Sequence, residues 1–287
     1  MILALLIFLL PLTQPVFAQD VSITPETATA SPTLSVTNTP TPLPTPTPDP
    51  NIALFQQYQK DFLFQRDLYQ SSYLDYTQKK QVHTKYGTIT TQKDKIDATK
   101  KVLIDRNNMM RAYTIALRTK LNINKSINST DTEKDQIELS KWESWFDEQN
   151  SVIPALNNES DISKWSQSFS NKLISIQQFW YTALVQNETN LRQITLSNIK
   201  NLASEIQSSL QTSNPEVQQW LTSLPIKSDL VDTSLTNAAN KTLVKQDLTR
   251  FNNFYPSAKT ELSKANSYLL EMDNNLKSII TKFGPQN

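Results

Sequence analysis

The chain has 287 residues and carries 28 basic and 27 acidic side chains, two glycines and no cysteine. A net charge this close to zero disfavours a nucleic-acid-binding protein, which normally shows a large basic excess. The lack of cysteine excludes disulfides, thiolate metal sites and thiol nucleophiles, and the scarcity of glycine disfavours tight hairpins and phosphate-binding loops, because both need positive φ.

Residues 1–18 have the pattern of a secretory signal peptide. Ile2–Leu10 is an apolar run too short to cross a bilayer, which takes about 20 residues, and Val16 and Ala18 place small residues before a signal-peptidase site. No Lys or Arg precedes the run, which departs from the pattern, and the alternative is a buried apolar N-terminus. We expect a secreted or cell-surface protein without a transmembrane helix, unless the segment is retained uncleaved as an anchor.

Residues 19–50 should form a disordered, extended linker rich in threonine and proline. Proline occupies every second position from Pro40 to Pro50. Because proline fixes φ and disfavours helix in the residue before it, we expect polyproline II, in which about thirty residues at ~3.1 Å each reach at most ~95 Å. The segment is either a spacer, whose threonines could accept O-linked sugars, or a tail without a role.

Residues 51–287 are expected to form an all-α, elongated antiparallel helical bundle with long coiled-coil-like helices. A first helix should run from about Ile52 to Tyr86 and end at Gly87, since glycine suits the position after a helix, and a second should follow Thr88–Thr91. The short connection and the seven-residue repeats indicate an antiparallel hairpin. The repeats are Phe55, Phe62, Tyr69, Tyr76 and His83, then Ile89, Ile96, Leu103, Met110 and Leu117.

Two further helices follow from local signals. Thr130 and Glu133 form a capping-box pattern that should open a third helix, which ends near Pro154. Ser160 or Asp161 can cap a fourth. No glycine or proline interrupts the next fifty or so residues, so one helix of roughly 75 Å is expected.

A new helix should begin at Asn214-Pro215-Glu216. Asn214 can cap it, Pro215 suits its first position, and Glu216 places an acid in its first turn. Pro225 should end that short piece, and a final long helix should run from about Asp229 to Phe283. Its apolar 4-3 stripe must dock on other helices, in this chain or in a second copy. The stripe keeps its phase across Pro256, which predicts a kink rather than a reversal. The stripe consists of Val244, Leu248, Phe251, Tyr255, Ala258, Leu262, Ala265, Leu269, Met272, Leu276, Ile279 and Phe283.

The sequence offers little for catalysis. His83 is the only histidine, and its place on the apolar repeat indicates a partly buried or helix-end residue rather than a ligand or general base. Two isolated glycines permit no P-loop, dinucleotide fingerprint or nucleophile elbow. Carboxylate-only chemistry stays open, although such pairs usually lie in clefts that a narrow bundle rarely supplies. We expect no enzyme, no cofactor and no metal site.

Two features could take part in binding. Tyr58, Tyr69, Tyr73 and Tyr76 could stack on sugars of a wall polymer, but aromatics at helical spacing are ordinarily core, which we favour. Residues 79–101 hold seven lysines against two aspartates, and such a tip could touch anionic wall polymers or lipid headgroups; a solvated loop end is the plainer interpretation. The lysines are Lys79, Lys80, Lys85, Lys93, Lys95, Lys100 and Lys101.

The expected function is that of a non-enzymatic structural or interaction module of the cell envelope. Its long helices would present a face or the basic tip to a protein partner or an envelope polymer, and self-association stays open. The alternative is an extracellular ligand-binding or sensory bundle, which needs a cavity lined by inward polar groups. A pore-forming hairpin would need an apolar tip, where the sequence places charge.

Overall fold

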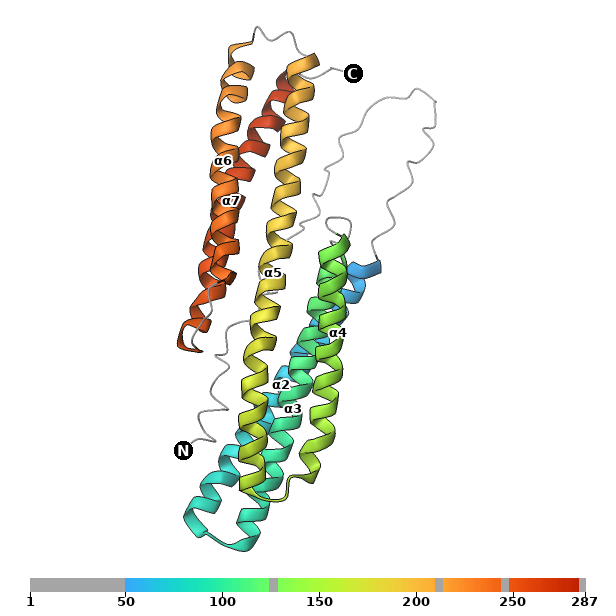
Figure 1. Ribbon diagram of the computed structural model, residues 1–287, viewed down its shortest axis with the longest axis vertical. Coiled ribbons are helices and arrows are strands. Elements are labelled where there is room, and N and C mark those ends of the chain that lie inside the picture. Colours follow the sequence, from blue (N-terminus) through green and yellow to red (C-terminus); the bar gives the residue numbers. More distant parts are fainter. Residues whose placement is uncertain (1–49, 124–128, 210–213, 244–247, 284–287) are drawn as a thin grey trace, which may run out of the picture.

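The computed structural model describes residues 50–123, 129–209, 214–243 and 248–283. These residues form six α-helices and one short 3-10 helix, with no strand among them (Figure 1). The predicted all-α, elongated antiparallel bundle is confirmed. The predicted signal peptide (1–18) and linker (19–50) lie outside the described residues, apart from Pro50, which is the first residue of a helix and not the last of the linker.

Helices α2 (Pro50–Tyr86) and α3 (Ile89–Ile123) form the predicted antiparallel hairpin. Gly87 lies between them at φ 60°, a conformation that residues with a Cβ rarely adopt, and its N–H donates to the carbonyl oxygen four residues back at 2.8 Å. Thr88 and Thr91 then cap α3 reciprocally, because each backbone N–H donates to the other residue's hydroxyl oxygen, at 3.1 and 3.2 Å. Local hydrogen bonds therefore fix this turn.

Helix α4 (Ser129–Val152) is the predicted third helix, but it begins at Ser129, one residue before the predicted cap Thr130, whose side chain lies outside the described residues. It ends in a 3-10 turn, η1 (Ile153–Ala155), that contains Pro154 as expected. Helix α4 packs antiparallel on α3. Two ion pairs join them, Arg118 Nε to Glu143 Oε1 at 2.6 Å and Arg111 Nε to Asp147 Oδ2 at 2.9 Å.

Helix α5 (Glu159–Ser209) is the predicted long helix, and its 51 residues span about 77 Å. The prediction that Ser160 or Asp161 caps it is wrong, because the cap is Asn158. Asn158 Oδ1 accepts from the N–H of Asp161 at 2.9 Å, and its Nδ2 donates to Asp161 Oδ2 at 2.8 Å. Asparagine caps helices as well as serine or aspartate does, and Asp161 serves as its partner in the first turn.

Helix α6 (Pro215–Leu243) starts as predicted, with Asn214 Oδ1 accepting from the N–H of Glu216 at 2.9 Å. Two other predictions about this region are wrong. Pro225 lies inside α6 rather than ending it. The single helix expected from Asp229 to Phe283 is instead the end of α6 followed by a separate helix.

That separate helix is α7 (Leu248–Phe283), and it packs antiparallel on α6. Lys282 pairs with Glu216 at 3.0 Å, and Lys227 pairs with Glu271, so the start of one helix meets the end of the other. The chain therefore reverses in the segment between the two helices. No glycine or proline marks the reversal, and the apolar repeat starts at Val244, between the two helices, and runs on into α7. The sequence pattern therefore did not indicate a break there. Helix α7 runs through its internal proline without reversing, as predicted.

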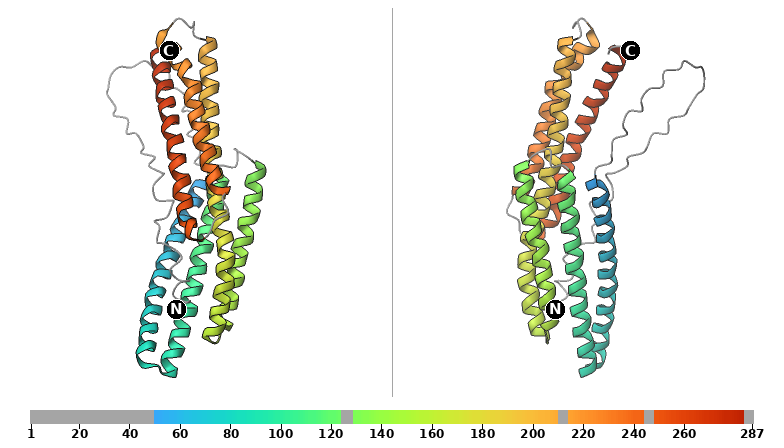
Figure 2. Two further views of the ribbon diagram at one scale, coloured as in Figure 1. Left: turned by 60° about the vertical axis from the view of Figure 1, so that its left-hand side comes forward. Right: turned by 90° about the vertical axis from the view of Figure 1, so that its right-hand side faces the viewer.

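Two large hydrophobic cores lie one after the other along α5, and a small cluster of Leu103, Ile153 and Ile162 lies beside the first. Figures 1 and 2 show the helices that form the two large cores arranged along α5. The N-terminal core is formed by α2, α3, α4 and the first half of α5, and it ends at Leu184. The C-terminal core is formed by the second half of α5 with α6 and α7, and it starts at Val185. Helix α5 is thus the element that both cores share.

The C-terminal core covers the predicted apolar stripe from within the chain. Seven of its residues are at most 5 % exposed: Ala258, Leu262, Ala265, Leu269, Met272, Leu276 and Ile279. Tyr255 is half-buried between the two cores. The side chains of the other four stripe residues lie outside the description. For the described residues, the face that could have joined a second copy is buried against α5 and α6.

Candidate functional site

The seven lysines of the predicted basic tip fall into two groups. Three of them already have a partner: Lys95 forms an ion pair with Glu159, Lys100 Nζ donates to Pro154 O at 2.9 Å, and Lys101 Nζ donates to Asp105 Oδ2 at 2.9 Å. The first two join α3 to the α4–α5 connection, and the third is a pair within α3. The structure therefore does not bring all seven lysines to one free surface.

The other four lysines surround the α2–α3 turn. Lys80 Nζ lies 5.9 Å from the ring centroid of Tyr76, and Lys85 Nζ lies 5.1 Å from that of Tyr86. None of the four forms an ion pair with a described residue. They are Lys79, Lys80, Lys85 and Lys93.

The same turn exposes apolar side chains, which the sequence did not lead us to expect. Ile89 is 88 % exposed, although the heptad repeat placed it on a buried stripe, and Tyr86 and Val82 are 59 % and 41 % exposed. The reason is that α2 ends at Tyr86, so no helix covers the first turn of α3. We call these three residues and the four lysines the hairpin tip. The α2–α3 turn extends beyond the neighbouring α4–α5 turn at the same end of the molecule (Figures 1 and 2).

His83 and the tyrosines of α2 contact other residues of the fold. The Nδ1 atom of His83 lies 3.1 Å from the hydroxyl oxygen of Thr91, within the capped turn, and the imidazole is partly buried there. Tyr69 and Tyr76 belong to the N-terminal core, which confirms the core interpretation for these two residues, and Tyr73 packs against that core. Burial raises the pKa of the Tyr69 and Tyr76 hydroxyls. Tyr58, the fourth, is half-buried.

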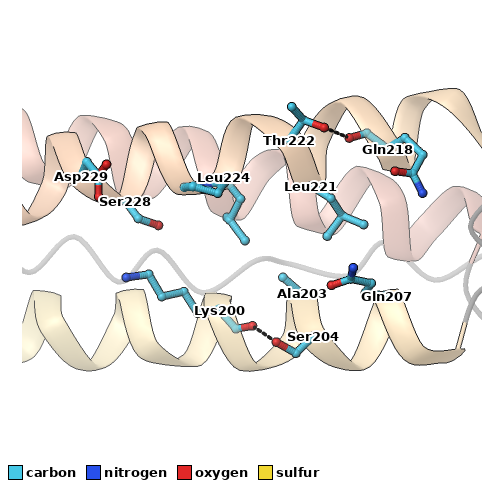
Figure 3. Close-up of a pocket in the computed structure, with 11 residues that line it drawn as sticks. Lys200, Ala203, Ser204, Gln207, Gln218, Leu221, Thr222, Leu224, Ser228 and Asp229 are labelled. Atoms are coloured by element: carbon cyan, nitrogen blue, oxygen red, sulfur yellow. Dashed lines mark hydrogen bonds between the residues drawn. The ribbon is translucent and has the colours of Figure 1, made fainter.

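A groove of about 520 Å³ lies between the second half of α5 and the first half of α6 (Figure 3). Polar side chains dominate its lining: Lys200, Ser204 and Gln207 from α5, and Gln218, Ser228 and Asp229 from α6. Figure 3 shows Ser228 and Leu221 directed from α6 toward α5. The sequence does not predict this groove, because polar residues on two helices do not reveal which of them face each other.

The proline inside α6 is one of the residues that line the groove, and it removes one backbone donor from the groove wall. Pro225 has no N–H, so the carbonyl oxygen of Leu221 lacks its intrahelical donor. Ser228 is 3 % exposed, and its hydroxyl oxygen has no partner among the described residues. The groove wall thus offers an acceptor and a hydroxyl that the helix itself leaves unused. A proline within an otherwise good helical pattern is the sequence signal that could have located it.

Arg106 is a buried cation of the N-terminal core. It is 4 % exposed, and its guanidinium carbon lies 4.4 Å from the ring centroid of Phe169 and 5.9 Å from that of Trp165. Its Nε and Nη2 atoms have no hydrogen-bond acceptor among the described residues. Burial lowers the pKa of Arg106 to about 10, and the nearby Tyr69 acts in the opposite direction. Among the described residues, these two aromatic rings are the groups that stabilise the buried positive charge of Arg106.

In the described part of the chain, no three His, Cys, Asp or Glu side chains lie close enough to hold a metal ion together. None of the described helices combines the length and the apolarity needed to cross a bilayer. Comparisons with protein families, curated proteins and solved structures give no match to this chain. The functional argument therefore depends on the geometry of the tip and the groove.

Proposed function

We propose that the protein is a non-enzymatic, secreted or cell-surface helical bundle that acts as a structural or interaction module of the cell envelope, with the hairpin tip as its contact surface. The location is supported by the signal-peptide pattern and the proline-rich segment of the sequence. The proposed role depends on one observation, the arrangement of the lysines at the hairpin tip. A hydrogen-bonded turn holds four lysines without a described ion-pair partner at the far end of a long hairpin.

A surface of this kind suits an anionic partner. Unpaired lysines keep their full charge for an incoming anion, whereas lysines already bonded to carboxylates do not. Because the turn is fixed by its own caps, little conformational entropy is lost when it binds. The proposed mechanism is thus based on shape and charge and involves no covalent chemistry.

Co-sedimentation of the full chain with isolated cell-envelope fragments tests this proposal. The tip triple variant replaces Lys79, Lys85 and Lys93 with glutamine. The control triple variant replaces Lys60, Lys241 and Lys259, which have similar exposure and lie away from the tip. We expect the tip variant to lose most of the sedimenting fraction, the control to retain it, and added salt to release the wild type. Equal binding by the two variants would contradict the proposal.

The groove supports a second candidate function, that of a ligand-binding bundle. Its lining holds one lysine and one aspartate among hydroxyl and amide groups, which suits a small neutral molecule rich in hydroxyl or amide groups. Thermal unfolding with millimolar neutral saccharides or amino acids tests it. A compound that fits should raise the unfolding midpoint of the wild type but not of the double variant Gln207→Ala with Ser228→Val, whereas Gln178→Ala on the exposed face of α5 should respond like the wild type. No shift with any compound would remove this candidate.

A further inference from the structure

We infer that the partner of the hairpin tip is an anionic lipid bilayer, on which the tip docks with its apolar residues in the headgroup region and its lysines on the phosphates. This inference rests on the proposed function and names the chemistry of the partner. The inference follows from one combination of features: exposed apolar residues and unpaired lysines lie together at one fixed turn.

The apolar part of the tip lies at the outermost point of the hairpin. Ile89 is the first residue of α3 and is 88 % exposed, and Tyr86, the last residue of α2, is 59 % exposed. A large aliphatic residue in water at such a position stabilises nothing in the fold, because no described side chain covers it. Isoleucine gains free energy on leaving water, and tyrosine is favoured at membrane interfaces, where its ring is apolar and its hydroxyl stays wet.

The charged part of the tip surrounds this apolar part. Lys93 lies one turn after Ile89 on the same side of α3, Lys85 directly precedes Tyr86, and Lys79 lies on α2. Two exposed acids near the tip, Asp94 and Asp97, reduce the positive charge of these three lysines and Lys80. At the neighbouring α4–α5 turn Glu159 is neutralised by its ion pair with Lys95, whereas Asp161 bonds to the neutral Asn158 and keeps its charge. The outward surface is still net basic, with four lysines against three aspartates.

The apolar residues decide between a bilayer and a soluble anionic polymer. A polymer would satisfy the lysines and leave Ile89, Tyr86 and Val82 in water. An anionic bilayer uses both sets, since lysine side chains can lay their methylene groups along the interface and place the ammonium on phosphates while apolar side chains enter the acyl boundary. Neither set alone gives stable attachment, because surface binding generally requires two signals. The tip supplies both.

Vesicle partitioning of the full chain tests the inference. Phosphatidylcholine vesicles with increasing fractions of phosphatidylglycerol are the probe, and every variant keeps the N-terminal apolar segment, so its contribution cancels. We expect the tip triple variant to lower partitioning about fivefold for each lysine removed. Ile89→Ser, which removes the apolar side chain without adding charge, should lower it at least tenfold. Ile226→Ser is the matched control, because Ile226 is 65 % exposed on α6, away from the tip, and should bind like the wild type.

A fluorescent reporter gives an independent readout of insertion. The chain has no cysteine, so Ile89→Cys and Ile226→Cys can each be labelled at one site with a polarity-sensitive dye. The dye at position 89 should shift to the blue with anionic vesicles, and the dye at position 226 should not. Far-UV circular dichroism checks that all variants remain helical.

Two outcomes would overturn the inference, and they are distinguishable. If the lysine substitutions weaken binding but Ile89→Ser does not, and the dye at position 89 shows no shift, the contact is purely electrostatic. Docking by apolar insertion is then wrong and nothing favours a bilayer over a soluble anionic polymer, while the proposed interaction role stands. If the tip and control variants also behave alike with envelope fragments, the hairpin tip is not the contact surface and both proposals fail.

Discussion

Arg106 shows at the scale of one residue how this bundle tolerates polar groups in its interior. The guanidinium is almost fully buried, and its charge faces aromatic rings rather than a carboxylate. A desolvated cation–π contact stabilises by about 2 kcal/mol, whereas each buried donor left without an acceptor costs about 1–3 kcal/mol. These two contributions are of similar size, but removing the charge itself from water costs several kcal/mol more, so the rings do not offset the loss of hydration in full. Arg106 is held in place by the packing around it, at a net cost to stability.

Replacing Arg106 with methionine should stabilise the protein. The substitution keeps an unbranched side chain of similar reach and removes an uncompensated buried charge. We expect the free energy of unfolding to rise by about 1–3 kcal/mol in chemical denaturation. Arg111→Met is the control, because Arg111 is 39 % exposed and pairs with Asp147, and its loss should change stability by less than about 1 kcal/mol in the unfavourable direction. A large loss of stability in Arg106→Met would show that the guanidinium has a binding partner.

The corrected cap of α5 gives a second prediction at this scale. Asn158→Ala should lower the free energy of unfolding by about 1 kcal/mol, because it leaves the first-turn N–H groups without their acceptor. Ser160→Ala should have no measurable effect, since Ser160 is exposed and does not cap the helix. Thermal unfolding of the two variants side by side checks this. The reverse order of effects would restore the original prediction.

Local start and stop residues made most of the helices predictable from the sequence. Gly87, Asn214 and Pro154 act on the backbone within a few residues of themselves, so their effect does not depend on the rest of the fold. The α6–α7 reversal was not predictable in this way, because it depends on α7 folding back to bury its stripe against α5 and α6. For the same reason, the apolar residues of the hairpin tip and the groove could not be predicted from the sequence. The exposure of Ile89 and the burial of Ser228 depend on which helix ends beside which.

Glu188 joins three helices at the point where the two cores meet. Its carboxylate pairs with Lys120 of α3 at 3.0 Å and with Arg192 of α5 at 2.7 Å. Arg192 Nε in turn donates to the carbonyl oxygen of Leu262 on α7 at 3.2 Å. Burial alone would raise the pKa of Glu188, but the charges and hydrogen bonds of Lys120 and Arg192 outweigh it and lower the pKa. This network is the polar link between the N-terminal and C-terminal halves.

The lowered pKa of Glu188 predicts an acid-dependent contribution to stability. Because the folded-state pKa lies below the ordinary value of 4.5, the contribution is complete above that pH and is lost as the pH falls through the folded-state pKa. Glu188→Gln should therefore be less stable than the wild type at pH 7, by about 1–3 kcal/mol. The difference should shrink below pH 4.5. Glu138→Gln, which removes a surface pair with Lys141, should cost no more than about 0.5 kcal/mol at any pH.

At the scale of the whole molecule, two cores depend on one shared helix. Four of the five tryptophans lie in or against the N-terminal core, and only Trp220 belongs to the C-terminal core. Tryptophan fluorescence of a Trp220→Phe variant therefore reports on the N-terminal core alone, whereas circular dichroism reports on every helix. The two signals together measure how far the cores are coupled.

We expect the two cores to unfold as one unit, because α5 runs without interruption from one to the other. In the Trp220→Phe background, Met272→Ala should remove about 2–5 kcal/mol from the C-terminal core, where Met272 is fully buried. If the cores are coupled, the fluorescence midpoint of the distant N-terminal core falls together with the dichroism midpoint. A fluorescence midpoint that stays unchanged would show instead that α5 frays between the cores and that the halves unfold separately.

The continuity of α5 also fixes the direction in which each end of the molecule faces. Each residue of an α-helix advances the chain by 1.5 Å and rotates it by about 100°. A single residue inserted between Leu184 and Leu196 would turn the α6–α7 pair, with its groove, by about a quarter of a circle relative to the hairpin tip. It would also separate Glu188 and Arg192 from their partners on α3 or α7. The number of residues in this stretch of α5 thus sets the angular offset between the two candidate binding surfaces, so natural or designed length changes there should be far less tolerated than substitutions on its exposed side.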